Sequence, residues 1–239
     1  MGQILFGGVG MQRRTSTVDT LLSGAPAVLS DQLFDVARVH QLKPGDVLFA
    51  AGDAGDGCYR LDKGLLKVMV TSTTGEERIV AILGPGAIVG ELAMIDRMPR
   101  SASVVALRDS VLRFISREAY EKRVLACPET KQALLEILAF RLRQADEGLA
   151  ASTFLSVKAR VARALLELAE LVGTPSGQQC IVLDEKISHA DLATMAGAAR
   201  EHASRVLSEW RRRNLVLTSV SQCYVLTDVA ALKREMNED

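Results

Sequence analysis

Several features that would assign a protein to an obvious class are missing from this chain of 239 residues. No apolar run approaches the roughly 20 residues of a membrane-spanning helix, and the first residues lack the charged-then-apolar order of a secretion signal. We therefore expect a cytoplasmic protein with no membrane partner. The four cysteines form no CxxC pair and the three histidines are dispersed, so the spacing predicts neither disulfides nor a metal site. The 29 basic and 29 acidic side chains cancel, which taken alone argues against a nucleic-acid partner.

The pattern of residues changes along the chain. Residues 1–36 mix small and apolar residues in short helical stretches. Residues 37–115 consist of short apolar runs separated by glycines, namely VLFA, CYRL, LLKVMV, RIVAIL, SASVVAL and SVLRFI. No helical stretch between them is long enough for a parallel crossover. This region is predicted to be an all-β roll or barrel.

A long helix is predicted from Glu129 to about Leu155. Its apolar residues recur at alternating spacings of three and four, as in the seam of a helix pair: Leu135, Leu138, Leu142, Ala145 and Leu149. The seam could pack on the core of a monomer. We favour a symmetric helix pair between two copies of the chain, because the compact roll beside it would leave the seam uncovered.

The most informative part of the β-rich region is the segment from Gly86 to Ala106. Gly90 permits a tight turn, and Glu91 can begin a helix whose first N–H groups favour an anion. Nine residues later, Arg100 and Ser101 offer a forked cation and a hydroxyl for phosphate oxygens. The carboxylate of Glu91 suits a sugar hydroxyl, so the segment predicts a ribose phosphate pocket. An ion pair between Glu91 and Arg100 is an alternative that the spacing leaves open.

Two stretches in this region, LKPGDVLFAAGDAGDGCYRLDKGLLKVMV and VGELAMIDRMPRSASVVA, resemble the cyclic-nucleotide-binding β-roll. More specifically, they resemble the phosphate-binding cassette of the catabolite-activator/FNR-type (CRP/FNR) bacterial regulators. The resemblance implies that Glu91 binds the ribose 2′-OH and that Arg100 and Ser101 bind the cyclic phosphate, assisted by backbone amides of Gly90 and Leu92. Many relatives keep the roll and lose this cassette, whereas here it is intact.

The same resemblance places the nucleotide base against the long helix, where Arg141 matches an arginine that pairs with the ribose-binding glutamate. The best-known cAMP-responsive member holds adenine with two hydroxyl residues, at positions occupied here by Ala145 and Asp146. Asp146 could accept hydrogen bonds from guanine or from the adenine amino group, or it could face solvent. We expect cAMP as the allosteric ligand, with cGMP or a dual response as alternatives. No cysteine cluster or axial ligand set suggests an iron–sulfur cluster or haem.

Residues 187–214 predict two helices joined by a tight turn. Ser188 is suited to cap the first helix, Gly197 permits the turn, and the second helix places its apolar residues on one side, namely Ala203, Val206, Leu207 and Trp210. LVLTSV and CYVLT would then form a β-hairpin wing, so the whole pattern predicts a winged helix-turn-helix. From the pattern alone, an ordinary amphipathic helix is the alternative.

This segment closely resembles the DNA-recognition unit of the same family. The Arg-Glu-x-x-x-Arg core of that unit matches Arg200, Glu201 and Arg205, which suit guanine and cytosine edges in the major groove. Further candidates for DNA contact are Ser188, His189 and Ser204. Ala199 stands where many members have Ser or Thr able to touch a phosphate, so slightly fewer backbone contacts are expected.

The basic charge is concentrated in this segment although the chain as a whole is neutral. Residues 198–214 contain two glutamates, Glu201 and Glu209, and five arginines, Arg200, Arg205, Arg211, Arg212 and Arg213. Neutrality therefore does not exclude DNA, and a confined footprint with a moderate salt dependence is expected.

Together these features predict an α+β protein with three parts. They are N-terminal helices and a jelly-roll-like β-roll over 1–128, a dimerisation helix over 129–155, and a winged helix-turn-helix over 156–239. The predicted function is a homodimeric, cAMP-gated transcription regulator that binds pseudo-palindromic double-stranded DNA and contacts RNA polymerase. A cyclic-nucleotide-binding module that acts on a protein partner is the alternative of a different class. An enzyme is not expected, because no metal cluster or placed nucleophile is evident.

Overall fold

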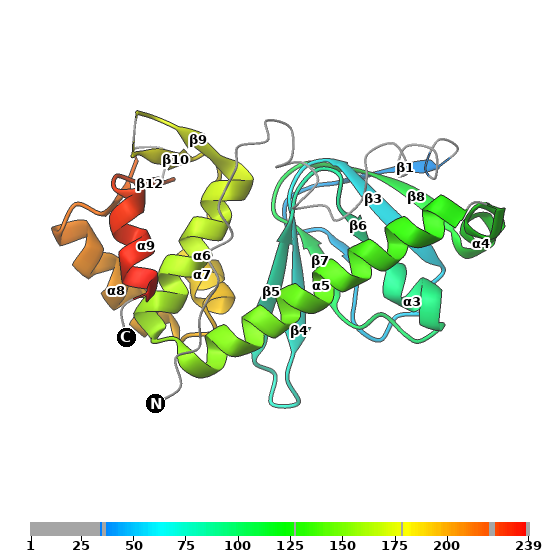
Figure 1. Ribbon diagram of the computed structural model, residues 1–239, viewed down its shortest axis with the longest axis horizontal. Coiled ribbons are helices and arrows are strands. Elements are labelled where there is room, and N and C mark those ends of the chain that lie inside the picture. The colour runs from blue at the N-terminus through cyan, green and yellow to red at the C-terminus, as the bar shows by residue number, and fades with distance from the viewer. Residues whose placement is uncertain (1–33, 35–36, 127, 178, 220–222, 238–239) are drawn as a thin grey trace.

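The computed structural model describes residues 34, 37–126, 128–177, 179–219 and 223–237. The helical stretches expected within residues 1–36 fall almost entirely outside this range, as does Cys127. Figure 1 shows a β-roll, a long helix beside it, and a C-terminal domain of helices and short strands. The predicted α+β architecture is therefore confirmed.

Two four-stranded antiparallel sheets form the β-roll, with strand orders β1-β8-β3-β6 and β2-β7-β4-β5. The strands are β1 (Arg38–Leu42), β2 (Val47–Phe49), β3 (Gly57–Lys63), β4 (Leu66–Thr71), β5 (Glu77–Leu83), β6 (Ile88–Val89), β7 (Ser103–Ala106) and β8 (Ser110–Ser116). All six predicted runs form strands. The sequence did not predict β1 or β6, because β1 is polar and largely exposed and β6 has only two residues.

The inner faces of the two sheets make the core of the roll. Leu61 on β3 lies opposite Leu112 on β8, and both are fully buried. Leu66 on β4 similarly pairs with Ala106 on β7. Such cross-strand pairs fix the register, since a slip by one residue would turn each of these side chains to the outside.

Three helices follow or interrupt the strands: α3 (Glu91–Asp96), α4 (Arg117–Ala126) and α5 (Pro128–Phe154). Ile137 on α5 is buried against the roll, in a cluster that also contains Cys58 and Tyr120. The opposite side of α5 exposes Leu135, Leu142 and Leu149, at 61%, 63% and 68%. Their spacing of seven residues makes this an exposed apolar seam. Of the two other positions that the sequence predicted for it, Ala145 is exposed and Leu138 is half-buried. Neither α5 nor another described helix is long and apolar enough to cross a membrane.

The C-terminal domain packs its helices on a four-stranded antiparallel sheet of order β11-β12-β10-β9. Its elements are α6 (Val157–Val172), β9 (Gly173–Pro175), β10 (Ile181–Leu183), α7 (His189–Met195), α8 (Arg200–Arg212), β11 (Val216–Thr218), β12 (Tyr224–Leu226) and α9 (Val229–Asn237). We expected TPSGQQ to be a loop, which is wrong for its first residues, because Thr174 and Pro175 belong to β9. The sequence did not predict this strand, because glycine and proline are typical of loops. Proline is tolerated here because β9 is an edge strand.

A buried carboxylate joins three helices of this domain. Glu235 on α9 is 4% exposed, and its oxygens lie 2.5 Å from Nζ of Lys158 on α6 and 2.6 Å from Nη1 of Arg213 after α8. Burial alone would raise the pKa of Glu235, but these two cations hold it below its ordinary value of 4.5.

The Glu235→Gln variant should therefore be less stable, with a free energy of unfolding lower by about 1–3 kcal/mol at pH 7, since it removes the charge that compensates two half-exposed cations. Because the pKa of Glu235 is lowered in the folded state, this stabilisation is present above pH 4.5 and is lost as the pH falls through the folded-state value. Urea unfolding of both proteins along a pH series measures the difference. A gap that stays constant into acid would contradict this account.

Candidate functional site

The turn before α3 depends on a glycine. Gly90 caps α3 in the left-handed conformation, with φ of 85°. A β-carbon added at Gly90 would lie 2.4 Å from Nη1 of Arg100, far inside contact distance. Only glycine therefore allows both the turn and the close approach of this guanidinium.

Arg100 is a buried cation held by three neighbours. Its side chain is 2% exposed, Nη1 donates to the carbonyl of Gly90 at 2.7 Å, and Nη2 lies 3.3 Å from Oδ1 of Asp56. The guanidinium carbon lies 4.3 Å from the centroid of the Phe49 ring, a cation–π contact. Its Nε is buried without a hydrogen-bond partner. The fork thus has donor capacity left for an anion.

Glu91 is the second buried charge of this region, 1% exposed. Its Oε1 is hydrogen-bonded to Arg141 of α5, whose guanidinium also donates to the carbonyl of Ile88. The structure therefore pairs Glu91 with Arg141 and Arg100 with Asp56, and does not show the Glu91–Arg100 ion pair that the spacing left open. Oε2 of Glu91 is buried without a partner, which leaves an acceptor for a hydroxyl group.

The other predicted nucleotide-site residues lie at the surface. Ser101 is exposed directly beside Arg100, and Leu92 is 40% exposed on α3. Ala145 and Asp146 are exposed on α5, one turn beyond Arg141. Among the described residues of a single chain, neither Ala145 nor Asp146 forms a hydrogen bond or ion pair with the buried charges, so their place on α5 alone brings them beside the site.

Three residues near these charges were not singled out from the sequence. Phe49 and Asp56 contact Arg100 directly, as described above. Cys58 is fully buried, and burial, with a smaller contribution from the charge of Glu91, raises the pKa of its thiol, so that it stays neutral. Only long-range contacts bring these residues to Arg100, and the sequence gives no signal for them.

The helix-turn-helix forms as predicted. Ser188 caps α7 by accepting a hydrogen bond from the N–H of Asp191 at 2.9 Å, and Gly197 makes the turn with φ of 56°. Ala203, Leu207 and Trp210 of α8 are buried in the core of the domain, with Val206 partly buried. Arg200, Glu201 and Arg205 are exposed on the opposite side, and Ser204 is half-buried between them.

The basic footprint is narrower than the sequence indicates. Arg213 is bound to Glu209 and Glu235, and Arg211 donates to the hydroxyl of Thr218. Arg200, Arg205 and Arg212 remain without an ion pair among the described residues. His189 contacts the wing, because its ring stacks on that of Tyr224 of β12 with centroids 6.1 Å apart.

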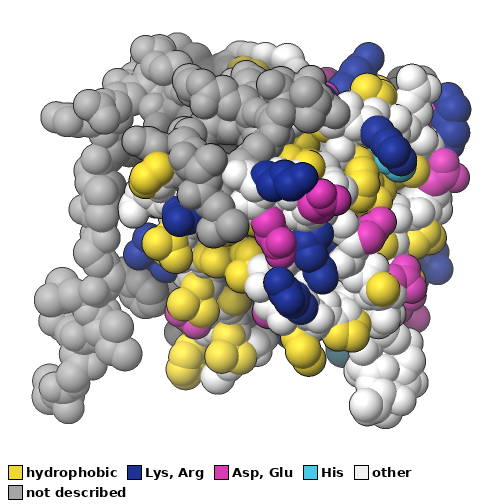
Figure 2. Space-filling view, turned by 90° about the vertical axis from the view of Figure 1, so that its right-hand side faces the viewer, with side chains coloured by type: hydrophobic (Ala, Val, Ile, Leu, Met, Phe, Trp, Pro, Cys, Tyr) yellow, Lys and Arg dark blue, Asp and Glu magenta, His cyan; other side chains and the backbone are white. Residues whose placement is uncertain are grey.

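The described side chains visible at the opposite end of the molecule are of mixed charge. Figure 2 looks at the roll end, where the visible Lys and Arg side chains alternate with Asp and Glu and with exposed apolar groups. A surface of mixed sign does not attract a polyanion.

Two models of known families match the chain. A cyclic nucleotide-binding domain matches residues 39–125, and a Crp-like helix-turn-helix domain matches residues 159–235. These ranges contain the buried charges around Gly90 and the two helices α7 and α8, respectively.

Individual proteins are similar over most of the chain. The CRP-like cAMP-activated global transcriptional regulator of Mycobacterium tuberculosis is 31% identical over 185 residues, covering 75% of this chain and 82% of that protein. The cyclic AMP receptor protein of Thermus thermophilus is 38% identical over 163 residues, covering 68% and 72%. A solved structure of a CRP/FNR-family regulator of the same organism has a TM-score of 0.71 at 25% identity, covering 84% of this chain and 99% of that one.

Proposed function

Because this chain belongs to the CRP/FNR family of DNA-binding transcription regulators and carries its cyclic nucleotide-binding domain, we propose that it is a homodimer gated by cAMP. The observation that carries the proposal is a pair of buried atoms without partners, Oε2 of Glu91 and Nε of Arg100, on either side of the turn at Gly90. One is an acceptor and the other a donor, as a ribose hydroxyl and a cyclic phosphate require.

In the proposed complex, the cyclic phosphate binds the Arg100 fork and the Ser101 hydroxyl, with the amides of Gly90 and Leu92 assisting. The phosphate replaces the carboxylate of Asp56, whose side chain is 72% exposed and can return to water at little cost. The ribose 2′-OH donates to Glu91. Arg141 of α5 already donates a hydrogen bond to this carboxylate, so a nucleotide bound to Glu91 is linked to α5 through Arg141.

The exposed seam of α5 supports the dimer. Leu135, Leu142 and Leu149 recur every seven residues on one side of the helix, and each is more than half exposed in the single chain. A second copy related by a two-fold axis would cover this seam with the same residues. Ligand then favours one arrangement of two recognition helices on a pseudo-palindromic site, to the extent that it binds that arrangement more tightly.

The reading of DNA is assigned to α8. Arg200 and Arg205 are proposed to contact guanine and Glu201 to contact cytosine, with Ser204 beside them and Ser188 and His189 near the backbone. A module that acts only on a protein partner would not need a helix-turn-helix domain, so we do not favour that alternative. RNA polymerase is proposed as a further partner. The division at residues 128 and 155 is also retained as a proposal, supported by the ends of α5.

Two relatives that exceed 30% identity carry cAMP in their names, which is why we favour this nucleotide. Asp146 favours cGMP as a second candidate, because an ionised carboxylate can accept from both N1–H and the 2-amino group of guanine. Titration calorimetry of the protein with cAMP and with cGMP distinguishes them and tests the proposal. Binding of neither nucleotide would contradict it.

We predict that Asp146→Thr shifts the ratio of the cAMP and cGMP affinities by about tenfold toward cAMP, the effect of losing one charge-assisted hydrogen bond to guanine. Calorimetry measures both affinities. The matched control is Glu136→Thr, an exposed acidic residue on the same helix, which should leave the ratio unchanged. An unchanged ratio in Asp146→Thr would place this residue outside the base pocket.

A further inference from the structure

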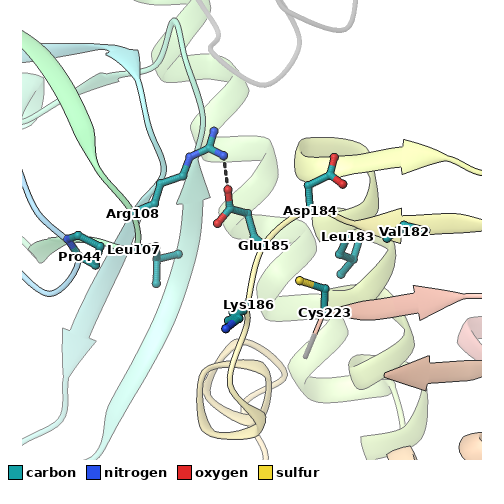
Figure 3. Close-up of a pocket in the computed structure, with 9 residues that line it drawn as sticks. All are labelled: Pro44, Leu107, Arg108, Val182, Leu183, Asp184, Glu185, Lys186 and Cys223. Atoms are coloured by element: carbon teal, nitrogen blue, oxygen red, sulfur yellow. Dashed lines mark hydrogen bonds and ion pairs between the residues drawn. The ribbon is translucent and has the colours of Figure 1, made fainter. Parts of the chain in front are cut away.

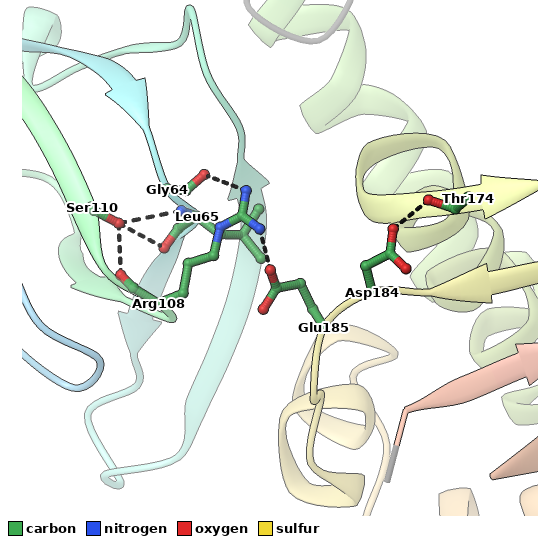
Figure 4. Close-up of polar contacts among 7 residues, drawn as sticks. All are labelled: Gly64, Leu65, Arg108, Ser110, Thr174, Asp184 and Glu185. Carbon is green, nitrogen blue, oxygen red and sulfur yellow. Dashed lines mark hydrogen bonds and ion pairs between the residues drawn. The ribbon is translucent and has the colours of Figure 1, made fainter. Parts of the chain in front are cut away.

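The C-terminal domain contacts the β-roll along two strips. Figure 4 shows the first, where Arg108 between β7 and β8 is ion-paired with Glu185 and donates to the carbonyl of Gly64. Beside it lies a pocket of about 500 Å³ between Pro44 and Leu107 of the roll and residues 182–186 of the C-terminal domain (Figure 3). The second strip is formed by α7 against β5.

Charges fix the second strip. Nζ of Lys67 on β4 lies 2.8 Å from Oδ1 of Asp191 on α7, and both side chains are less than a quarter exposed. Burial alone would raise the pKa of Asp191, but hydrogen bonds from Lys67 and Ser188 hold it below its ordinary value, so the pair is charged at neutral pH. The helix-turn-helix is therefore held on the roll through its first helix.

At the other end of α7, two guanidinium groups lie against the turn at Gly197. Arg160 of α6 donates to the Gly197 carbonyl at 2.7 Å. Arg78 of β5 comes from the roll, and its Cζ lies 3.3 Å from the place where a β-carbon of Gly197 would be. The turn leads directly into α8, whose first residues are three positions further on.

The two guanidinium groups differ, because Arg160 already donates to the Gly197 carbonyl and Arg78 does not. The side chain of Arg78 is exposed, and no hydrogen bond or ion pair joins its guanidinium to another described residue. It points outward because its neighbour Ile79 is buried inside the roll and successive strand residues alternate in direction. Among the described residues, Arg78 is thus a cation without an ion pair, and it lies beside the start of the recognition helix.

A helix-turn-helix brings the first residues of its recognition helix to the base edges, so the flanking phosphates pass close to the turn before that helix. At this turn, Ala199 caps α8 without any side-chain hydrogen bond and offers no hydroxyl to a phosphate. We propose that Arg78, a residue of the nucleotide-binding roll, binds a backbone phosphate of double-stranded DNA at the edge of the groove that α8 enters. The proposal rests on the function proposed above and extends the DNA interface to the roll.

The test uses the full-length protein with saturating cAMP and a duplex that the wild-type protein selects from a random-sequence library. Binding constants are measured by fluorescence anisotropy over a range of salt concentrations. The slope of log K against log salt is negative, and each lost phosphate contact reduces its magnitude by about 0.9. In a dimer, which loses two contacts, Arg78→Ala should therefore reduce the magnitude of the slope by about 2. The preference for the selected duplex over a scrambled one should not change, because a phosphate carries no sequence information.

Two further variants keep the result interpretable. Arg78→Lys retains the charge and should retain most of the slope. Arg38→Ala removes another exposed arginine from β1, which lies away from the C-terminal domain in Figure 1, and should leave the slope unchanged. Calorimetry with cAMP establishes that each variant is folded.

An unchanged slope in Arg78→Ala would overturn the proposal, even if more nucleotide were then needed for DNA binding, since Arg78 would be a contact between domains only. The same holds if Arg38→Ala lowers the slope equally. These outcomes leave the regulator function intact. Failure of the wild-type protein to select any duplex would instead contradict the proposed function itself.

Discussion

Replacing Arg100 with leucine is expected to abolish cyclic-nucleotide binding while the protein remains folded. The guanidinium is 2% exposed, so a phosphate bound to it would be shielded from water. Truncating one partner of such a buried charge pair costs about 2–5 kcal/mol, which corresponds to an affinity loss of roughly 30-fold to several thousand-fold. Titration calorimetry with cAMP would then show no measurable heat of binding.

The fold should survive because the neighbours of Arg100 tolerate its loss. Leucine can pack on the Phe49 ring, and Asp56 is exposed enough to be solvated. Arg97→Leu is the matched control on the same segment, because Arg97 is 72% exposed and forms only a surface ion pair with Glu121. Arg100→Lys keeps the charge without the fork and should bind with intermediate affinity. Unchanged affinity in Arg100→Leu would refute the assignment of the phosphate site.

Local patterns predicted the elements of this fold well. Apolar runs predicted every strand of the roll except β1 and the two-residue β6. Ser188 and Gly197 marked the ends of α7, because their roles depend only on neighbouring backbone. The strands β1 and β9 were missed for the opposite reason. Their residues are polar or conformationally restricted, and they form strands because β8 and β10 offer unpaired edges to them.

The candidate site divides in the same way. Gly90, Glu91 and Arg100 could be predicted because a short segment carries all of them. The contacts of Arg100 with Asp56 and of Arg141 with Glu91 span 44 and 50 residues, and only the closed roll and the position of α5 create them. The sequence predicted the Arg141 contact through a family resemblance alone, whereas the Asp56 contact was not expected.

The second large effect is expected from Leu142→Glu. Leu142 is 63% exposed at the middle of the α5 seam, so a symmetric helix pair would bring the two glutamates together on its axis. Sedimentation velocity should show a monomer. Because each monomer then binds its half-site alone, affinity for the selected duplex should fall by at least about 100-fold, the contribution of joining two binding units.

Nucleotide binding distinguishes loss of the dimer from loss of the fold. Glu91, Arg100 and Arg141 gather within a single chain, so the Leu142→Glu monomer should still bind the phosphate and the ribose. Gln144→Glu adds the same charge on α5 two residues away and off the seam, and it should remain dimeric. If Leu142→Glu also stays dimeric, the seam is not the interface. Retained discrimination between cAMP and cGMP in the monomer would further mean that one copy of α5 forms the base pocket by itself, whereas its loss would mean that both copies contribute to it.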